Sequence, residues 1–353
     1  YTVFKPADNV YLTKKPATPA GAQGLDFPIP GANGAQIFTF WSKGIPDNKV
    51  DSVLVAIHGK DRNPDYYYST FSSILKKAVG YGSATPNTVI VAPLFFSTVN
   101  DEQAYSPNEL GWADSNAWSS GDGSTHPLAT SLLGPAVSPV SAFTVLDSLV
   151  EHFANAAQYP NMKYITVVGH GGGGQLATRH AALGNDNPAP NRISLRHVIG
   201  DPSSQLAVST LLMLMWTFLM LIYRCCSRQF TEDRPTAVND ISCPLWDSYR
   251  YSLNNYSPGG AYPLAFGGDP VKLFKRFASR DVRYVIGAED DKSNGDQSCM
   301  AAAWAGQERF LLLRQLPCLR NGCRRLCSAV SSFSPCAIQG HKFAAQDHLC
   351  CWC

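Results

Sequence analysis

The stretch YITVVGHGGGGQLATRHAAL, residues 164–183, decides the fold. It opens with residues of high strand propensity (164–168), passes through a run of glycines and continues with a helical pattern over 175–179. The stretch therefore predicts a buried strand, a sharp turn and a helix in direct succession. The turn carries no hydroxyl or thiol, because no serine, cysteine or threonine occurs between Val167 and Ala177.

Other apolar segments alternate with helical ones along the chain. The segments that predict strands are 52–59, 88–96, 195–204 and 282–291. Helical spacing predicts helices over 65–82 and 140–157, and the second carries on one face Phe143, Leu146, Leu149, Val150 and Phe153. We expect residues 1–35 to form an irregular lead-in with short strands. The alternation predicts an α/β fold with a mostly parallel central sheet flanked by helices, in one domain over 1–310.

The composition is that of an ordinary globular protein. Of the 353 residues, 45% are hydrophobic and 16% are charged, and the formal net charge is +2. This balance argues against a disordered chain. The first 220 residues contain no run of lysine and arginine of the kind that binds nucleic acid. We predict a protein that binds no nucleic acid, no cofactor and no metal ion.

The glycine-rich turn fits a known catalytic motif in all but one position. Residues 169–173, Gly-His-Gly-Gly-Gly, match the nucleophile elbow G-x-S-x-G except that Gly171 replaces the serine. Two further motifs lie where predicted strands end, IHGKDRN at 57–63 and VIGAEDD at 285–291. With these motifs and NELGWADSNAW at 108–118, the chain resembles the α/β-hydrolase fold over about residues 35–310. More narrowly, it resembles secreted fungal and bacterial serine hydrolases of the esterase and lipase type.

The resemblance implies a catalytic triad with one member missing. The nucleophile position falls at Gly171, which has no side chain that could attack a substrate. The acid falls at Asp290, with Asp291 as the alternative, and the base falls at His341. A helix N-cap or a surface carboxylate is the competing interpretation of Asp290. The sequence around His341 does not look like the end of such a hydrolase.

The resemblance also implies two donors for a substrate oxygen. One is the backbone N–H of Gly172, and the other comes from Lys60 or Asp61. Two histidines close to these donors in the sequence are expected to have structural roles and not catalytic ones. We expect His58, before a glycine at a strand end, to be structural, and His170 to pack beside the elbow.

Three functions remain open. The first is a serine-hydrolase-fold protein for esters or related acyl substrates, inactive because Gly171 replaces the nucleophile. The second is a non-catalytic protein that uses the same pocket to bind a small ester or apolar ligand. The third is a protein anchored in a membrane through the uncharged run 206–223. The position of the run argues against this function, because the run interrupts the predicted sheet. Natural loss, engineering and sequence error are all open as origins of the glycine.

Two stretches do not fit the rest of the chain. Deleting residues 208–229 joins Ala207 to Phe230 and restores an uninterrupted segment that begins DPSSQLA and continues FTEDRP. We interpret this insertion as a translated, unspliced intron. The tail 311–353 is rich in cysteine and arginine and has no clear period. A frame-shifted end fits it better than a zinc site, because its cysteines lack paired C-x₂-C spacing.

The cysteines outside these stretches form one pair. Of the eleven cysteines, only Cys243 and Cys299 remain when the insertion and the tail are set aside. A single pair of this kind predicts a disulfide and a secreted, extracellular protein. Two unrelated buried thiols are the alternative.

Overall fold

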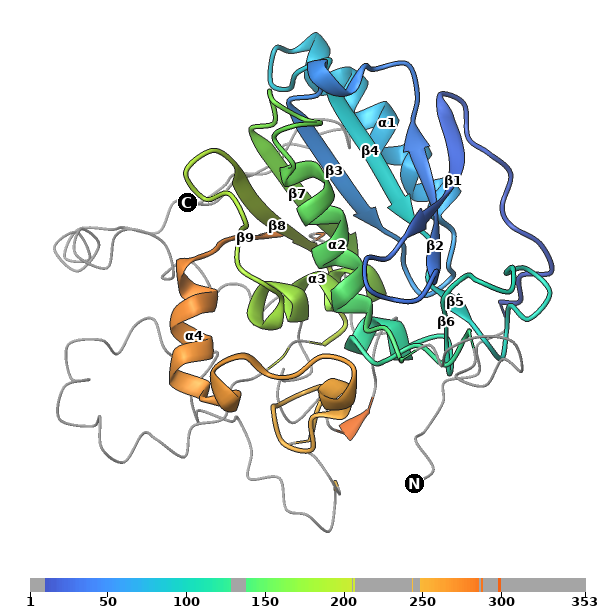
Figure 1. The fold of residues 1–353 in the computed structure, drawn as a ribbon, viewed down its shortest axis with the longest axis vertical. Helices are drawn as coiled ribbons and strands as arrows, with labels where there is room; N and C mark the ends of the chain where they lie inside the picture. Colours follow the sequence, from blue (N-terminus) through green and yellow to red (C-terminus); the bar gives the residue numbers. More distant parts are fainter. Residues whose placement is uncertain are drawn as a thin grey trace, which may run out of the picture.

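The computed structural model describes residues 10–127, 138–204, 206, 243, 248–285, 287 and 298–299. Within this part of the chain one sheet has the strand order β1-β2-β4-β3-β7-β8-β9 (Figure 1). Its strands are β1 (Ala22–Pro28), β2 (Gln36–Ser42), β3 (Ser52–Ile57), β4 (Thr88–Pro93), β7 (Tyr164–His170), β8 (Ser194–Gly200) and β9 (Asp281–Val285). The helices are α1 (Pro64–Gly80), α2 (Ala142–Ala154), α3 (Gly172–Leu183) and α4 (Pro270–Ser279). A separate pair of short strands consists of β5 (Phe96–Ser97) and β6 (Gly111–Trp112).

Most of the sheet is parallel. β4, β3, β7, β8 and β9 pair in parallel, whereas β2 pairs antiparallel with both β1 and β4. In the register, Ile57 lies opposite Gly169 and His170 lies opposite Gly200. The carboxyl ends of β3, β7 and β8 therefore meet at one edge of the sheet, and the loops that follow them lie side by side.

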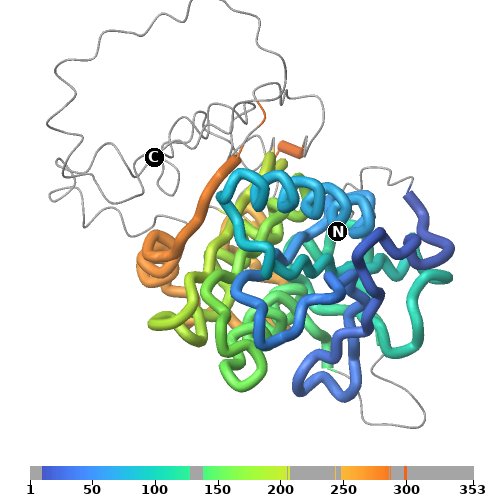
Figure 2. Tube along the Cα trace, turned by 90° about the horizontal axis from the view of Figure 1, so that it is seen from above, coloured from blue at the N-terminus to red at the C-terminus, as the bar shows by residue number. Residues whose placement is uncertain are grey.

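Helices cover both faces of the sheet. Figures 1 and 2 show α1 on one face and α2 with α3 on the other. Alternate strand residues supply the two sides of the core, as the pleat requires. Val55 and Val167 belong to the cluster that includes α2, α3 and α4, while Ala56 and Val168 belong to the cluster beside α1. All five apolar residues predicted for the inner face of α2 are buried.

The sequence predicted most of these elements, but not all. The strands β3, β4, β7, β8 and β9 and the helices α1, α2 and α3 overlap the predicted segments, with bounds that differ by a few residues. The strand β2 was missed, although it lies inside the sheet between β1 and β4. The helix α4 was also missed. It is short, its N-cap Asp269 accepts hydrogen bonds from Val271 and Lys272 N–H, and it buries only Leu273 and Phe277.

Two sequence-based interpretations fall outside the described residues. They are the intron interpretation of 208–229, with its flanks Ala207 and Phe230, and the frame-shifted tail 311–353. The apolar run 206–223 also lies outside, apart from the buried Leu206. Within the described part of the chain, no helix has the length and apolar character needed to cross a membrane.

Candidate functional site

The turn after β7 consists of one residue. β7 ends at His170 and α3 begins at Gly172, so Gly171 alone connects strand and helix. Its φ of +56° and ψ of −116° lie in a region that residues with a side chain rarely adopt. Hydrogen bonds hold the turn on both sides. Gly171 N–H donates to Gly200 O and Gln175 N–H donates to Gly171 O, each at 3.0 Å.

Three glycines around this turn are required by the packing of α3 against the sheet. A Cβ atom on Gly169 would lie 2.2 Å from the carbonyl carbon of Gly173. On Gly173 it would lie 2.5 Å from Ile57 O, and on Gly174 it would lie 2.5 Å from Gly200 O. Side chains do not approach backbone atoms this closely. These three positions therefore accept only glycine without a shift of the backbone.

Gly171 differs from these three glycines. A Cβ atom built at Gly171 meets no described atom within 4 Å. A side chain would therefore extend from the turn into open space, as the nucleophile does in an elbow of this shape. Gly171 has the backbone of a nucleophile position and lacks the nucleophile.

The loop after β3 lies beside the elbow and holds its first peptide firmly. The carbonyl of Gly59 accepts hydrogen bonds from His58 Nδ1–H at 2.7 Å and from Arg62 N–H at 3.2 Å. The other ring nitrogen of His58, Nε2, accepts from Phe95 N–H at 2.9 Å. Burial lowers the pKa of His58 to about 3. His58 is thus a neutral residue that fixes the loop, and both its nitrogens are used.

The backbone N–H of Lys60 belongs to the peptide that His58 fixes. A trans peptide points its C=O and N–H in opposite directions, so this N–H faces away from His58 and Arg62. The nitrogen of Lys60 lies 3.4 Å from the Cβ position of Gly172. Among the described residues it has no acceptor. The N–H of Gly172 is in the first turn of α3, where backbone donors lack an intrahelical acceptor.

These two donors flank Gly171 at the start of a helix. Such an arrangement suits an oxygen that carries negative charge, because amide dipoles and the helix N-terminus both favour it. Asp61, the alternative to Lys60 as the second donor, stays a prediction.

A buried tryptophan lies beside Gly172, one of the two donor residues. Trp118 comes from the short 3-10 helix η2 (Ala117–Ser120), and its ring approaches the Cβ position of Gly172 to 3.3 Å. It stacks on Phe95 with ring centroids 5.3 Å apart and meets His58 edge-on at 4.7 Å. Trp118 is the last residue of the motif 108–118, which predicted no role for it. Its contact with Gly172 depends on a fold that brings residues far apart in sequence together.

His170 lies at the rim of the site. Its Nδ1 is 3.2 Å from the hydroxyl of Tyr67, and its Nε2 is 3.3 Å from Asp201 Oδ2. As expected, its side chain packs beside the elbow, although more than half of it is exposed. Asp201 also accepts from Gly287 N–H at 2.9 Å, which ties the end of β8 to the chain after β9. Neither Tyr67 nor Asp201 was predicted as a site residue.

The other predicted triad residues lie outside the described part of the chain. These are Asp290, its alternative Asp291 and His341. The structure therefore brings together Lys60, Gly171 and Gly172, and the acid and the base stay predictions. Within the described residues, no group of three or more His, Cys, Asp or Glu side chains could hold a metal ion.

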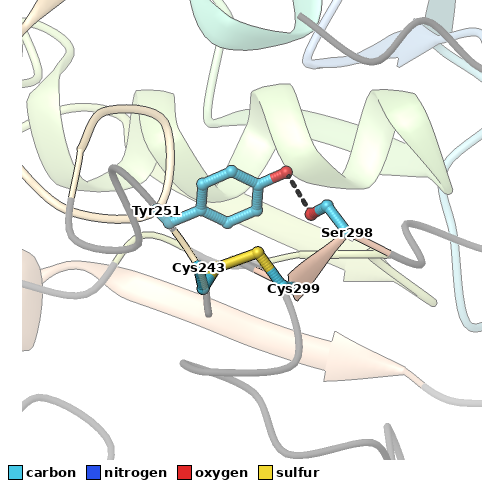
Figure 3. The surroundings of a disulfide bond; sticks show 4 residues. All are labelled: Cys243, Tyr251, Ser298 and Cys299. Atoms are coloured by element: carbon cyan, nitrogen blue, oxygen red, sulfur yellow. Dashed lines mark hydrogen bonds between the residues drawn. A yellow bond between two sulfur atoms is a disulfide. The ribbon is translucent and has the colours of Figure 1, made fainter. Parts of the chain in front are cut away.

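The predicted disulfide is present. Cys243 and Cys299 are bonded, with their Cα atoms 5.7 Å apart (Figure 3). Beside the bond, the hydroxyls of Tyr251 and Ser298 are 3.0 Å apart and form a hydrogen bond. The two hydrogen-bonded residues lie 47 positions apart in the sequence, so the disulfide and this contact join the same two segments.

The strand order, the antiparallel β2 and the elbow between β7 and α3 together define the α/β-hydrolase fold. The sequence matches no protein-family profile and no curated protein.

Solved structures of hydrolases resemble the chain at low identity. A poly(aspartic acid) hydrolase of Sphingomonas sp. KT-1 is 15% identical, with 90% of this chain and 89% of that chain covered and a TM-score of 0.49. A poly(3-hydroxybutyrate) depolymerase of Bordetella parapertussis is 13% identical, with 88% and 80% covered and a TM-score of 0.49. A siderophore hydrolase of Aspergillus nidulans is 12% identical, with 90% and 86% covered and a TM-score of 0.35. Similarity at this level says nothing about substrate, and the fold assignment depends on the strand order.

Proposed function

We propose that this chain binds the carbonyl group of a small ester or related acyl ligand at the elbow and does not cleave it. The main support for the proposal is the presence of glycine at position 171. Its backbone has the elbow conformation, and the space for a nucleophile is open, but the side chain is absent. Beside it, the N–H groups of Lys60 and Gly172 provide donors for the ligand oxygen.

The missing oxygen atom accounts for the absence of turnover. A serine hydrolase forms a covalent bond between its serine and the acyl carbon, and this elbow has no hydroxyl or thiol that could replace the serine. Catalytic triad residues act as a unit, and loss of the nucleophile alone costs of order 10⁶ in rate in one serine protease. The donors that bind the carbonyl oxygen do not depend on the nucleophile, so binding survives its loss.

The remaining parts of the proposal concern the acid, the base and the cellular location. Asp290 or Asp291 would be the acid and His341 the base of a parent enzyme with serine at position 171. We further propose a secreted protein with one domain over 1–310, supported by the disulfide between Cys243 and Cys299.

Hydrolysis of p-nitrophenyl acetate tests the proposal. We expect the unmodified chain, freed of contaminating esterases, to release nitrophenol no faster than buffer. The Gly171→Ser variant should gain activity only if an acid and a histidine base are in place. The Gly171→Ala variant is the matched control, because it adds the same Cβ atom without the hydroxyl. Turnover by the unmodified chain that persists through successive purification steps would refute the proposal.

A further inference from the structure

A fully buried ion pair lies directly behind the loop that carries the Lys60 N–H. Arg62 Nε is 2.7 Å from Asp101 Oδ2, and Arg62 Nη2 is 3.1 Å from Asp101 Oδ1. Both side chains have no exposed surface. A buried ion pair of this kind is weak support for stability, because removing both charges from water offsets much of their attraction. The contacts of the pair therefore matter more than its net free energy.

Arg62 holds both peptides that flank Lys60. Its backbone N–H donates to Gly59 O at 3.2 Å, and its Nη1 donates to Lys60 O at 3.0 Å. With both carbonyls held by one residue, the two peptide planes have little freedom to rotate. The Lys60 N–H lies in the first of these planes, so its direction is set by Arg62 together with His58.

Asp101 in turn fixes the guanidinium of Arg62. The planar fork of arginine matches a carboxylate at two points, which sets the orientation of the guanidinium. The carboxylate of Asp101 also accepts from Ser97 N–H at 2.7 Å and from Leu12 N–H at 3.1 Å. The pair is therefore anchored to the backbone at the end of β5 and at Leu12 as well as to the loop after β3.

The competing explanation is purely structural. Arg62 Nη2 donates to Val10 O at 2.6 Å, and Asp101 binds Leu12, so the pair also holds the segment that contains residues 10–12. A role limited to this segment would affect folding and would leave the preference for a carbonyl oxygen unchanged. The two explanations thus differ in a measurable way.

We propose that Arg62, held by Asp101, is a positioning residue that aims the Lys60 N–H at the carbonyl oxygen of the ligand. This inference depends on the proposed function, because it concerns the same donor. Arg62 does not touch the ligand and acts only through the backbone of Lys60.

The test compares two probes that differ in the carbonyl, p-nitrophenyl butyrate and p-nitrophenyl butyl ether. Calorimetry should show that the unmodified chain binds the ester about tenfold more tightly than the ether, as hydrogen bonds to one oxygen would give. The double variant Arg62→Met with Asp101→Leu removes both buried charges at once. We expect it to stay folded and to prefer the ester only about threefold, because the Gly172 N–H still donates while the Lys60 N–H is no longer aimed.

Two further variants make the result specific. The Arg196→Met, Asp281→Asn variant removes another ion pair, between β8 and β9 with Nε and Oδ2 2.8 Å apart, and should keep the tenfold preference. The Arg62→Lys variant keeps the charge but cannot hold Asp101 and Lys60 O together, and should lose at least about threefold of the preference. It serves as the test if the double variant does not fold.

The outcomes separate the inference from the function it depends on. A folded double variant, or the lysine variant, that keeps the full preference for the ester overturns the positioning role and leaves the proposed function intact. An unmodified chain that binds neither probe, or binds both equally, contradicts the proposed function and the inference with it.

Discussion

Gly171 and its neighbours are glycines for different physical reasons. At Gly169, Gly173 and Gly174 a Cβ atom would collide with backbone, so the contact between α3 and the sheet depends on their lack of a side chain. At Gly171 the space is open, and only the positive φ favours glycine. Loss of the nucleophile therefore leaves the close packing around it unchanged, which explains how the elbow keeps its shape without serine.

Burial of His58 also predicts that the stability of the protein depends on pH. The pKa of His58 is about 3 in the folded protein, against 6.5 in the unfolded chain, because burial disfavours the charged form. As the pH falls below 6.5, the unfolded chain takes up a proton that the folded protein does not. His58 therefore lowers the free energy of unfolding by about 1.4 kcal/mol per pH unit down to about pH 3.

Urea unfolding between pH 7 and pH 4.5 measures this slope. The His58→Asn variant should lose about 1.4 kcal/mol per pH unit of it. Burial also lowers the pKa of His197 well below its ordinary value, so its contribution should remain in the variant. An identical slope in the variant and the unmodified chain would show that His58 is protonated in the folded protein.

Some site residues could be predicted from sequence and others could not. Lys60, Gly171 and Gly172 lie in short motifs whose spacing along the chain shows where strands end. Arg62 and Asp101 are 39 residues apart, and their pairing depends on how β3 and β4 align. No local pattern carries that information, so only the structure revealed this pair.

At the scale of elements, periodicity was a good guide where it extended over many residues. α2 was predicted, and the five apolar residues expected on one face are all buried, because three turns of apolar spacing leave little ambiguity. β2 was missed because it is a seven-residue strand, QIFTFWS, with its centre buried on both faces and no alternation to distinguish it from the lead-in. Its antiparallel direction is likewise set by pairing with β1 and β4, which the sequence does not show.

Deletion of the insertion 208–229 should improve the solubility of the protein without loss of stability. If the segment is intronic, no site has evolved to bury its large apolar side chains, and each leaves roughly 1.5–3 kcal/mol of burial unrealised. The variant that joins Ala207 to Phe230 should be more soluble than the full chain and at least as stable, as measured by sedimentation and thermal unfolding.

A control variant replaces 208–229 with a glycine- and serine-rich linker of the same length. It should also be more soluble, because the apolar run and not the added length is the cause. Unfolding of the domain upon deletion would instead identify the segment as a structural element and end the intron interpretation.

At the scale of the whole molecule, the sheet brings the ends of β3, β7 and β8 to one edge, and the site forms where they meet. Sequence order alone predicted a mostly parallel sheet but not the order β1-β2-β4-β3-β7-β8-β9. The disulfide was predictable for a different reason. Once the two atypical stretches are set aside, Cys243 and Cys299 are the only cysteines left in the sequence, so each could pair only with the other. The fold places them together.

The disulfide should contribute measurably to the stability of the whole chain. It closes a loop with a sequence separation of 56, for which the chain-entropy model gives about 4 kcal/mol. The Cys243→Ser, Cys299→Ser variant should therefore unfold at a lower urea concentration, with a loss of about 2–4 kcal/mol. Reductant should destabilise the unmodified chain and leave this variant unchanged. Equal stability of the two chains in oxidising buffer would contradict a structural role.

Equilibrium dialysis of the unmodified chain against p-nitrophenyl butyrate tests the central claim most directly. We predict one molar equivalent of bound, intact ester and no nitrophenol beyond that formed in buffer. The Gly172→Val variant should bind none, because its side chain would occupy the space beside Lys60 N and Trp118. Nitrophenol release that rises in proportion to the protein, or ester binding that Gly172→Val leaves unchanged, would contradict a ligand held uncleaved at the elbow.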